Sequence, residues 1–157
     1  MVNTNRFIER GGIWVLVQIP VLLAGIFVPS WTGREPDWSS VAAPVGAIIV
    51  ALSAALLFIA FLTLGRDLTP FPQPRNAAHL RQDGIYGWMR HPIYTAVMAF
   101  PLGWSLLHHS TVGLAVVAAT ALFFDRKARR EEQMLLNRYP EYAQYRRRVR
   151  RFLPGIY

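Results

Sequence analysis

The sequence contains no cysteine. Disulfides, thiolate zinc sites, iron–sulfur clusters and a cysteine nucleophile are therefore excluded. It also lacks a glycine-rich phosphate loop followed by lysine, and it has no serine-centred nucleophile elbow. The neighbouring His108 and His109 have no carboxylate close by in the sequence. They form an incomplete set of metal ligands, and we predict no metal site.

Charged residues are absent from two long apolar stretches, residues 13–28 and 41–64. The second is long enough to cross a hydrocarbon core of ~30 Å as a helix. Hydrophobic residues make up 53% of the chain, which is high for a water-soluble protein. The first stretch contains a proline and no clear cleavage site follows it, so we interpret it as a retained span. The sequence predicts an integral membrane protein.

Two further apolar stretches are shorter. The first is Pro92–Leu107, and a turn at residues 108–110 separates it from the second, residues 111–124. The helical pattern of the second continues with many charges to residue 137, which predicts a helix about 40 Å long that projects into water. Both short stretches could cross a membrane by tilt, by local thinning of the bilayer, or as a tight hairpin with a polar cavity at its open end.

A last short helix is predicted over residues 140–150. Tyr142, Tyr145 and Val149 fall on one face of it, and arginines surround that face. This pattern is typical of an amphipathic helix that lies on the membrane surface.

Together these patterns predict an all-α fold. We expect an integral membrane bundle of about four transmembrane helices, with a cytoplasmic extension and a C-terminal interfacial helix. Residues 1–157 are interpreted as a single domain, with two spans in 1–64 and the candidate chemical groups in 65–157. The proline-rich segment 68–74 cannot form a regular helix, and we interpret it as a lid or a pocket wall.

Alanines recur every four residues in the second apolar stretch, at Ala43, Ala47, Ala51 and Ala55. A ridge of small side chains lets another helix approach closely in lipid. We expect this ridge to pack inside the fold, with a dimer seam as the weaker alternative. An oligomer is possible but nothing in the sequence indicates one.

The formal net charge of +8 is unevenly spread, since ten of the 17 Lys and Arg residues lie between residues 126 and 151. The loops at 30–40 and 108–110 hold one basic residue. The positive-inside rule therefore places both termini and the polar connection 65–91 in the cytoplasm, at the inner membrane if the cell is bacterial. We expect the basic tail to bind anionic lipid headgroups rather than nucleic acid, because it is tethered to a bilayer.

The segment 83–94 concentrates glycine, aromatic, Arg and His residues between two apolar blocks. Pro92 is suited to the first position of a helix, and it disfavours helical dihedrals at His91. Arg90, His91 and two tyrosines at such a junction could hold a polar ligand. The alternative is a membrane-proximal loop in which Arg90 contacts lipid phosphate and the tyrosines lie at the interface.

Asp125, Arg129 and Glu132 share one face of the predicted long helix, because they are spaced i, i+4 and i+7. They could form a solvent-exposed stripe of salt bridges. They could also bind a ligand with amine, carboxylate and hydroxyl groups, since Arg can pair with a carboxylate through two parallel hydrogen bonds.

At these motifs the second half of the chain, about residues 64–157, resembles the isoprenylcysteine carboxyl methyltransferase and phospholipid methyltransferase superfamily. The matching residues, in order, are Leu80, Gly84-Ile85-Tyr86, Arg90-His91-Pro92-Ile93-Tyr94, Glu131-Glu132, Tyr142-x-x-Tyr145-x-x-x-Val149 and Leu153-Pro154. Two positions depart from the family pattern: Ala96 replaces a frequent Gly, and Ala78 replaces a His that here stands next to it as His79.

The resemblance implies S-adenosylmethionine as the methyl donor, and it makes residues 65–157 a cofactor-binding catalytic region. The implied cofactor-binding residues are His79, Leu80, Gly84, Tyr86, Arg90, His91, Pro92, Tyr94, Glu131 and Glu132. The implied catalytic residues are Arg90, Arg129 and Glu132. The methyl acceptor would be lipid-like and enter from the bilayer, with a prenylcysteine-like carboxylate favoured over other lipid O-, N- or S-nucleophiles.

Two other functions stay open at this point. Membrane sterol and enone reductases, which use NADPH, are similar to this superfamily in the same half of the chain. Pro92 after Arg-His favours the methyltransferase, because those reductases usually carry another residue there. A non-enzymatic membrane scaffold is the third possibility, and the clustered polar motifs make it the least favoured.

Overall fold

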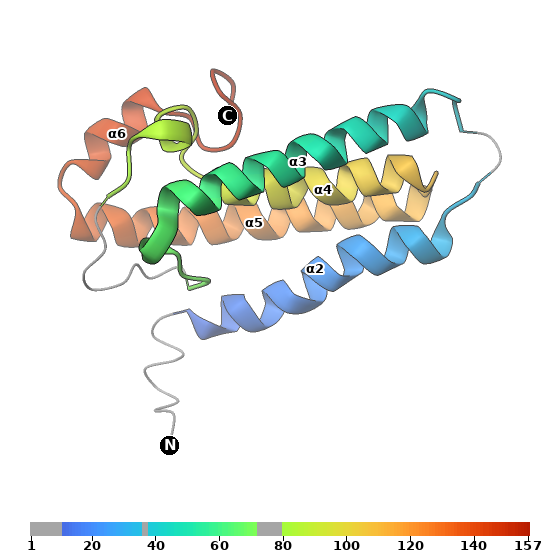
Figure 1. Ribbon diagram of the computed structural model, residues 1–157. Coiled ribbons are helices and arrows are strands. Elements are labelled where there is room, and N and C mark those ends of the chain that lie inside the picture. Colours follow the sequence, from blue (N-terminus) through green and yellow to red (C-terminus); the bar gives the residue numbers. More distant parts are fainter. Residues whose placement is uncertain (1–10, 36–37, 72–79) are drawn as a thin grey trace.

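The computed structural model describes residues 11–35, 38–71 and 80–157. Every long element in these ranges is a helix, as Figure 1 shows. The α-helices are α2 (Gly12–Thr32), α3 (Ala42–Leu64), α4 (Pro92–Leu107), α5 (Thr111–Arg138) and α6 (Tyr142–Arg148), and two short 3-10 helices are η1 (Gly65–Asp67) and η2 (Gly84–Gly87). The prediction of an all-α fold is confirmed.

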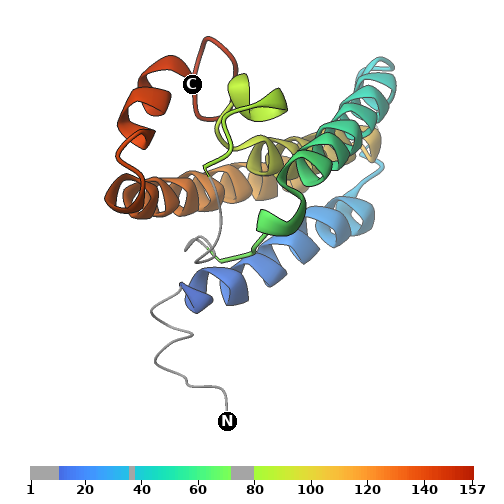
Figure 2. The ribbon, with the colours of Figure 1, turned by 60° about the vertical axis from the view of Figure 1, so that its left-hand side comes forward.

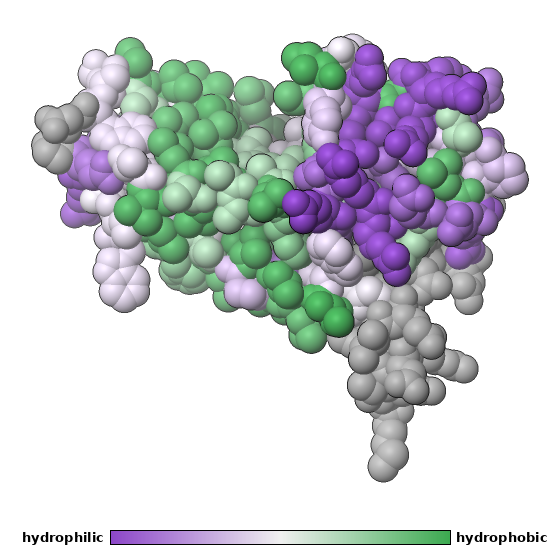
Figure 3. Space-filling model, turned by 180° about the vertical axis from the view of Figure 1, so that it is seen from behind, coloured by the Kyte–Doolittle hydropathy of each residue, from purple (hydrophilic) through white to green (hydrophobic). Residues whose placement is uncertain are grey.

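Two of the described helices, α2 and α3, are long and apolar enough to cross a membrane. Only 17% of the apolar window of each is buried inside the protein, so neither is the core helix of a soluble fold. Phe27, Phe58 and Leu62 are each at least 60% exposed. Figure 3 shows this apolar surface ending at a hydrophilic end of the molecule. An exposed apolar surface of this extent is expected to face lipid.

The four-span count stays a prediction. α4 has 16 residues, fewer than the ~20 that cross a hydrocarbon core without adjustment. α5 has 28 residues, but charged residues fill its second half.

The contact between α3 and α4 depends on two glycines. A Cβ atom on Gly46 would lie 2.5 Å from the carbonyl oxygen of Gly103 and 2.5 Å from the amide nitrogen of Leu107. A Cβ atom on Gly103 would lie 2.8 Å from the carbonyl oxygen of Gly46. The two backbones therefore touch, and no larger residue fits at either position without separating the helices.

The alanine ridge of α3 does not pack inside the fold, so that prediction is wrong. Ala47, Ala51 and Ala55 are exposed. The buried face of α3 instead carries Gly46 and Ser53, which lie seven residues apart. Small residues occur on both faces of this helix, and their spacing alone could not show which face meets α4.

Substituting Gly46 by Val is expected to destabilise the protein by about 1–3 kcal/mol, because overpacking must push α3 away from α4. The matched control is Ala47→Val, which adds similar bulk one residue away on an exposed face. Melting temperatures of the purified proteins in detergent measure the difference. Equal melting temperatures for the two variants would contradict the close backbone contact.

The packing of the four long helices leaves space for a cavity. α3 packs along α4, whereas α2 packs on α5 and on α4. Figures 1 and 2 show that α2 lies below the other long helices. Residues of all four helices, α2, α3, α4 and α5, surround this cavity.

The two loops with few basic residues lie together at one end of the bundle. The amide of Arg34 donates to the carbonyl oxygen of His108 at 2.6 Å, and Glu35 accepts from the amide of Thr111 at 2.9 Å. α6 and the chain's last residues lie at the opposite end (Figure 1). This is the arrangement expected from the charge pattern, and the side on which each end lies stays a prediction.

The apolar face of α6 is buried within the protein. Tyr142 and Tyr145 are 1% and 2% exposed, and they pack with Val149 against Leu80 and Leu135. The prediction that this face lies on the membrane is wrong, because α5 and the loop before η2 already cover it. The helix is also shorter than the predicted 140–150.

Candidate functional site

The Arg90-His91-Pro92 segment joins η2 to α4. Pro92 occupies the first turn of α4, as predicted, and His91 is the residue before the helix, with a non-helical backbone. The amides of Arg90 and His91 donate to the carbonyl oxygens of Arg150 and Arg151 at 2.9 and 3.0 Å. The segment is therefore fixed by backbone pairing with the chain that follows α6.

Glu132 lies at the centre of a buried ionic cluster. Its side chain is 2% exposed, and two guanidinium groups bind it. Nε and Nη2 of Arg90 donate to Oε1 at 3.0 and 2.9 Å. Nε and Nη2 of Arg151 donate to Oε1 and Oε2 at 3.0 and 2.9 Å. Nε2 of His91 lies 3.3 Å from Oε1.

The Nη1 donors of Arg90 and Arg151 are also used. Nη1 of Arg90 donates to the carbonyl oxygens of Arg146 and Val149. Nη1 of Arg151 donates to Oδ1 of Asp125 at 3.0 Å. This cluster connects α4, α5, α6 and the C-terminal segment, so it stabilises the packing of these elements.

The charge of Glu132 is strongly favoured by these neighbours. Burial opposes ionisation, but hydrogen bonds from His91 and Arg151 and the charge of Arg90 hold the pKa of Glu132 well below its usual range. Glu132 is thus a fixed anion at neutral pH.

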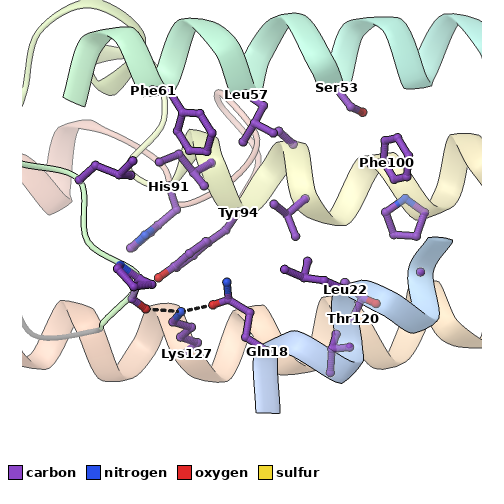
Figure 4. A pocket seen from close by; sticks show the side chains of 18 of the residues that line it. Gln18, Leu22, Ser53, Leu57, Phe61, His91, Tyr94, Phe100, Thr120 and Lys127 are labelled. Carbon is purple, nitrogen blue, oxygen red and sulfur yellow. Dashed lines mark hydrogen bonds between the residues drawn. The ribbon is translucent and has the colours of Figure 1, made fainter. Parts of the chain in front are cut away.

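A cavity of ≈ 620 Å³ lies beside this cluster, between α2, α3 and α4. Apolar side chains of these three helices form most of its wall. Figure 4 shows His91, Tyr94, Lys127 and Gln18 at one end of it and Phe100 toward the other. A volume of this size is typical of sites for small organic ligands.

This cavity opens toward the apolar surface. Ile26 on α2 and Phe61 on α3 both line it, and each is 40% exposed. Ala54 on α3 also lines it and is exposed. A ligand with an apolar body could therefore pass between α2 and α3 without crossing a polar layer.

A smaller cavity of ≈ 100 Å³ lies on the polar side of the same segment. Its wall includes Asp67, Arg81, Tyr139, Tyr142 and Tyr145. The hydroxyl of Tyr142 is buried, and no partner hydrogen-bonds to it among the residues that the structure describes. A buried polar atom without a partner is costly, and a ligand group that hydrogen-bonds to it would remove that cost.

The two cavities share one wall. Leu64, Thr69, Tyr86, Arg90, His91 and Glu131 line both of them. The hydroxyl of Tyr94 donates to Oε2 of Glu131 at 2.8 Å, and the rings of Tyr94 and His91 are stacked with centroids 5.2 Å apart. Burial raises the pKa of Tyr86 above its usual value, so this phenol stays neutral. The shared wall is the place where ligands in the two cavities would meet.

The structure brings most of the predicted site residues to this wall. Tyr86, Arg90, His91 and Glu131 border both cavities, Tyr94 borders the larger one and Leu80 the smaller one. Gly84 and Pro92 border neither, and they shape the backbone on each side. His79 lies outside the described residues.

Arg129 and Glu132 do not line either cavity. The side chain of Arg129 is 59% exposed and pairs with Asp125 at 2.7 Å and with the hydroxyl of Tyr157 at 3.1 Å. Glu132 is enclosed by its cluster. The predicted face of Asp125, Arg129 and Glu132 therefore exists, but its side chains bind Arg151 and Tyr157 of the same chain.

Sequence reasoning missed the face of α5 that does line the larger cavity. Thr120, Lys127 and Glu131 line it. Phe124, which lies between Thr120 and Lys127 in the sequence, is buried. Their spacing of i, i+4, i+7 and i+11 places all four on one side of a helix. A search for that period from Glu131 backwards would have found Lys127.

The chain matches the phospholipid methyltransferase family over residues 41–142. The chain belongs to this family. The matched range includes every predicted site residue. The described residues also include two helices of membrane length, α2 and α3.

Two curated relatives are similar to this chain over 94% of its length. It is 30% identical over 151 residues to the cobalt-zinc-cadmium resistance protein CzcN of Cupriavidus metallidurans. It is 28% identical over 150 residues to the nickel-cobalt-cadmium resistance protein NccN of Alcaligenes xylosoxydans xylosoxydans. The chain spans 65% and 66% of the lengths of these two proteins.

A solved structure with the same fold is that of the eukaryotic intramembrane Ras methyltransferase ICMT, an isoprenylcysteine carboxyl methyltransferase. The TM-score is 0.67 at 21% sequence identity, over 99% of this chain and 55% of that chain. At this identity the match shows a common fold.

Proposed function

We propose that this protein transfers a methyl group from S-adenosylmethionine to an acceptor that carries an apolar tail. The observation that supports the proposal most is the pair of cavities with one shared wall. The smaller cavity, called the polar cavity below, has charged residues and tyrosines in its wall, whereas the larger one is mainly apolar. They meet at Tyr86, Arg90, His91 and Glu131. A two-substrate transfer between a polar and a lipidic molecule needs such a junction.

The residues of the polar cavity fit the cofactor. Glu131 can accept hydrogen bonds from an ammonium group or from ribose hydroxyls, and the unpartnered hydroxyl of Tyr142 can bond to a polar group. Tyr86, Tyr139 and Tyr145 offer aromatic surface to a flat base. When bound there, S-adenosylmethionine supplies a methyl group activated on a sulfonium centre.

In this proposal the protein positions the two substrates and excludes water from the site. Methyl transfer needs in-line alignment and a dry site, without a covalent enzyme intermediate. Arg90 is held by Glu132 and by two carbonyl oxygens, so the wall between the cavities is rigid. His91 is 6% exposed and stacks on Tyr94, which keeps bulk water from the junction.

The acceptor enters from the bilayer in this proposal. The apolar cavity opens between α2 and α3, on a surface that faces lipid. An acceptor's tail would occupy the apolar part, and its reactive group would reach the shared wall. The family name indicates phospholipids as one class of acceptor, and prenylcysteine-like carboxylates are the class that we favour.

The exposed arginines of the polar end are proposed to contact anionic lipid headgroups. Arg146, Arg147, Arg148 and Arg150 are all exposed. Because the apolar face of α6 is buried, this contact would be electrostatic, at about 1 kcal/mol per residue near the surface.

Thermal melting of the purified protein in detergent tests the cofactor. We expect S-adenosylhomocysteine at ~100 times its dissociation constant to stabilise the protein by about 2.7 kcal/mol. For a chain of this size that corresponds to roughly 5–10 °C in melting temperature. NADPH should have no such effect. Stabilisation by NADPH without any by S-adenosylhomocysteine would replace the proposal with a reductase.

A further inference from the structure

One buried cation is not needed by the ionic cluster that holds the site together. Lys127 is 1% exposed and lines the larger cavity. Its Nζ donates to Oε1 of Gln18 on α2 and, at 2.9 Å, to the carbonyl oxygen of Pro70. Figure 4 shows these two bonds and the position of Lys127 below the ring of Tyr94. Nζ lies 5.4 Å from the centre of that ring.

Both bonds of Lys127 go to neutral oxygens. Among the described residues, no carboxylate lies within 4.0 Å of Nζ. An ammonium group has three donors, and two are used. Buried charges in proteins are normally paired with an opposite charge. The ammonium of Lys127 therefore has a free donor and no direct ion pair at the polar end of an apolar cavity, and the carboxylate of Glu131 acts on it only from more than 4.0 Å away.

The two cavities differ in the charged side chains that line them, and this difference could favour a different ligand in each. Glu131 lines both cavities, whereas Lys127 lines only the larger one. A cation in the polar cavity would face the carboxylate of Glu131. In the larger cavity, Glu131 already accepts a hydrogen bond from the hydroxyl of Tyr94, and an anion there would bind at the ammonium of Lys127.

We infer that Lys127 determines the specificity of the larger cavity, by binding the carboxylate head of an acceptor whose tail fills the apolar part. The inference rests on the proposed function only in naming that molecule an acceptor. The binding site itself follows from the burial of Lys127, its hydrogen bonds to neutral oxygens and its lack of a direct ion pair.

The geometry explains why a lysine rather than an exposed arginine would have this effect. The apolar walls exclude water, and a hydrogen bond between charged groups is stronger in such surroundings than in water. Burial lowers the pKa of Lys127 to about 8, so the side chain is mainly charged at neutral pH. An ionised carboxylate is already in its reactive form and needs no base at this position.

Binding of ligands with the same tail and different heads tests the inference. The probes are dodecanoate, dodecanol and dodecylamine, added to the detergent-solubilised protein at pH 7, with dissociation constants taken from the ligand dependence of the melting temperature. We expect dodecanoate to bind the wild type about tenfold or more tightly than dodecanol, as a hydrogen bond to a charged group would give. Lys127→Met should abolish that preference and Lys127→Arg should retain it.

Two control variants separate this role from simpler ones. Gln18→Met removes the hydrogen bond between α2 and Lys127 but keeps the ammonium. Arg130→Met removes an exposed cation from the same helix. Both should retain the preference for dodecanoate. Its loss in Gln18→Met would make Lys127 a structural link, and its loss in Arg130→Met would make the preference a general surface effect; either result overturns the inference.

Binding of S-adenosylhomocysteine is measured on the same proteins. We expect Lys127→Met to retain wild-type affinity for it, because Lys127 does not line the polar cavity. A wild type that binds S-adenosylhomocysteine but prefers dodecanol or dodecylamine would overturn the inference alone. A wild type that prefers dodecanoate but does not bind S-adenosylhomocysteine would overturn the proposed function alone.

Discussion

Substituting Glu132 by Gln is expected to destabilise the protein by about 3–5 kcal/mol, the usual effect of removing one partner from a buried ion pair. The neutral amide would leave the guanidinium group of Arg90, which is 7% exposed, without its counter-charge, and Arg151, which is 12% exposed, would keep only Asp125. These two arginines connect α4 and the C-terminal segment to α5. The loss should therefore be cooperative, and it is measured as a fall in the melting temperature in detergent.

The neighbouring Glu131→Gln is the matched control for this variant. Glu131 is 25% exposed and accepts a hydrogen bond from Tyr94, which a glutamine oxygen can also accept. We expect a change in stability of less than about 1 kcal/mol, together with weaker binding of S-adenosylhomocysteine. Similar melting curves for the two variants would show that Glu132 does not hold the cluster together.

The adjacent glutamates show what the sequence could and could not predict. The motif identified both residues as one Glu-Glu element. On a helix, neighbours point about 100° apart, so one residue faces the cavities and the other faces Arg151. The partners of Glu132 are 42 and 19 residues away along the chain, and no local pattern fixes such pairings.

Helix positions were predicted well where the signal was local. α4 has the predicted bounds, because Pro92 starts it and the turn at 108–110 ends it. The predicted second apolar stretch and α3 differ by one residue at the start. The faces of helices were predicted less well. The aromatic face of α6 and the alanine ridge of α3 both have patterns that suit lipid or protein, and tertiary packing decides between the two.

The largest predicted effect on activity concerns the opening between α2 and α3. We expect Ala54→Trp to reduce methyl transfer to a farnesylated cysteine by roughly ten- to a hundredfold, because misplacing a substrate by a small distance has an effect of this size. Ala54 lines the cavity and is exposed, so a large side chain there obstructs the opening without disturbing the buried face of α3. Binding of S-adenosylhomocysteine should not change.

The control for the opening is Ala55→Trp. Ala55 is also exposed on α3, but it does not line the cavity. We expect it to retain wild-type transfer, measured with a radiolabelled methyl group. The S-methyl counterpart of the same cysteine, which has no long tail, should be a poor substrate for all three proteins. Because the proposal places the cofactor in the polar cavity, we expect the obstruction to affect only the acceptor. Full activity of Ala54→Trp on the farnesylated compound would show that the acceptor reaches the shared wall by another path.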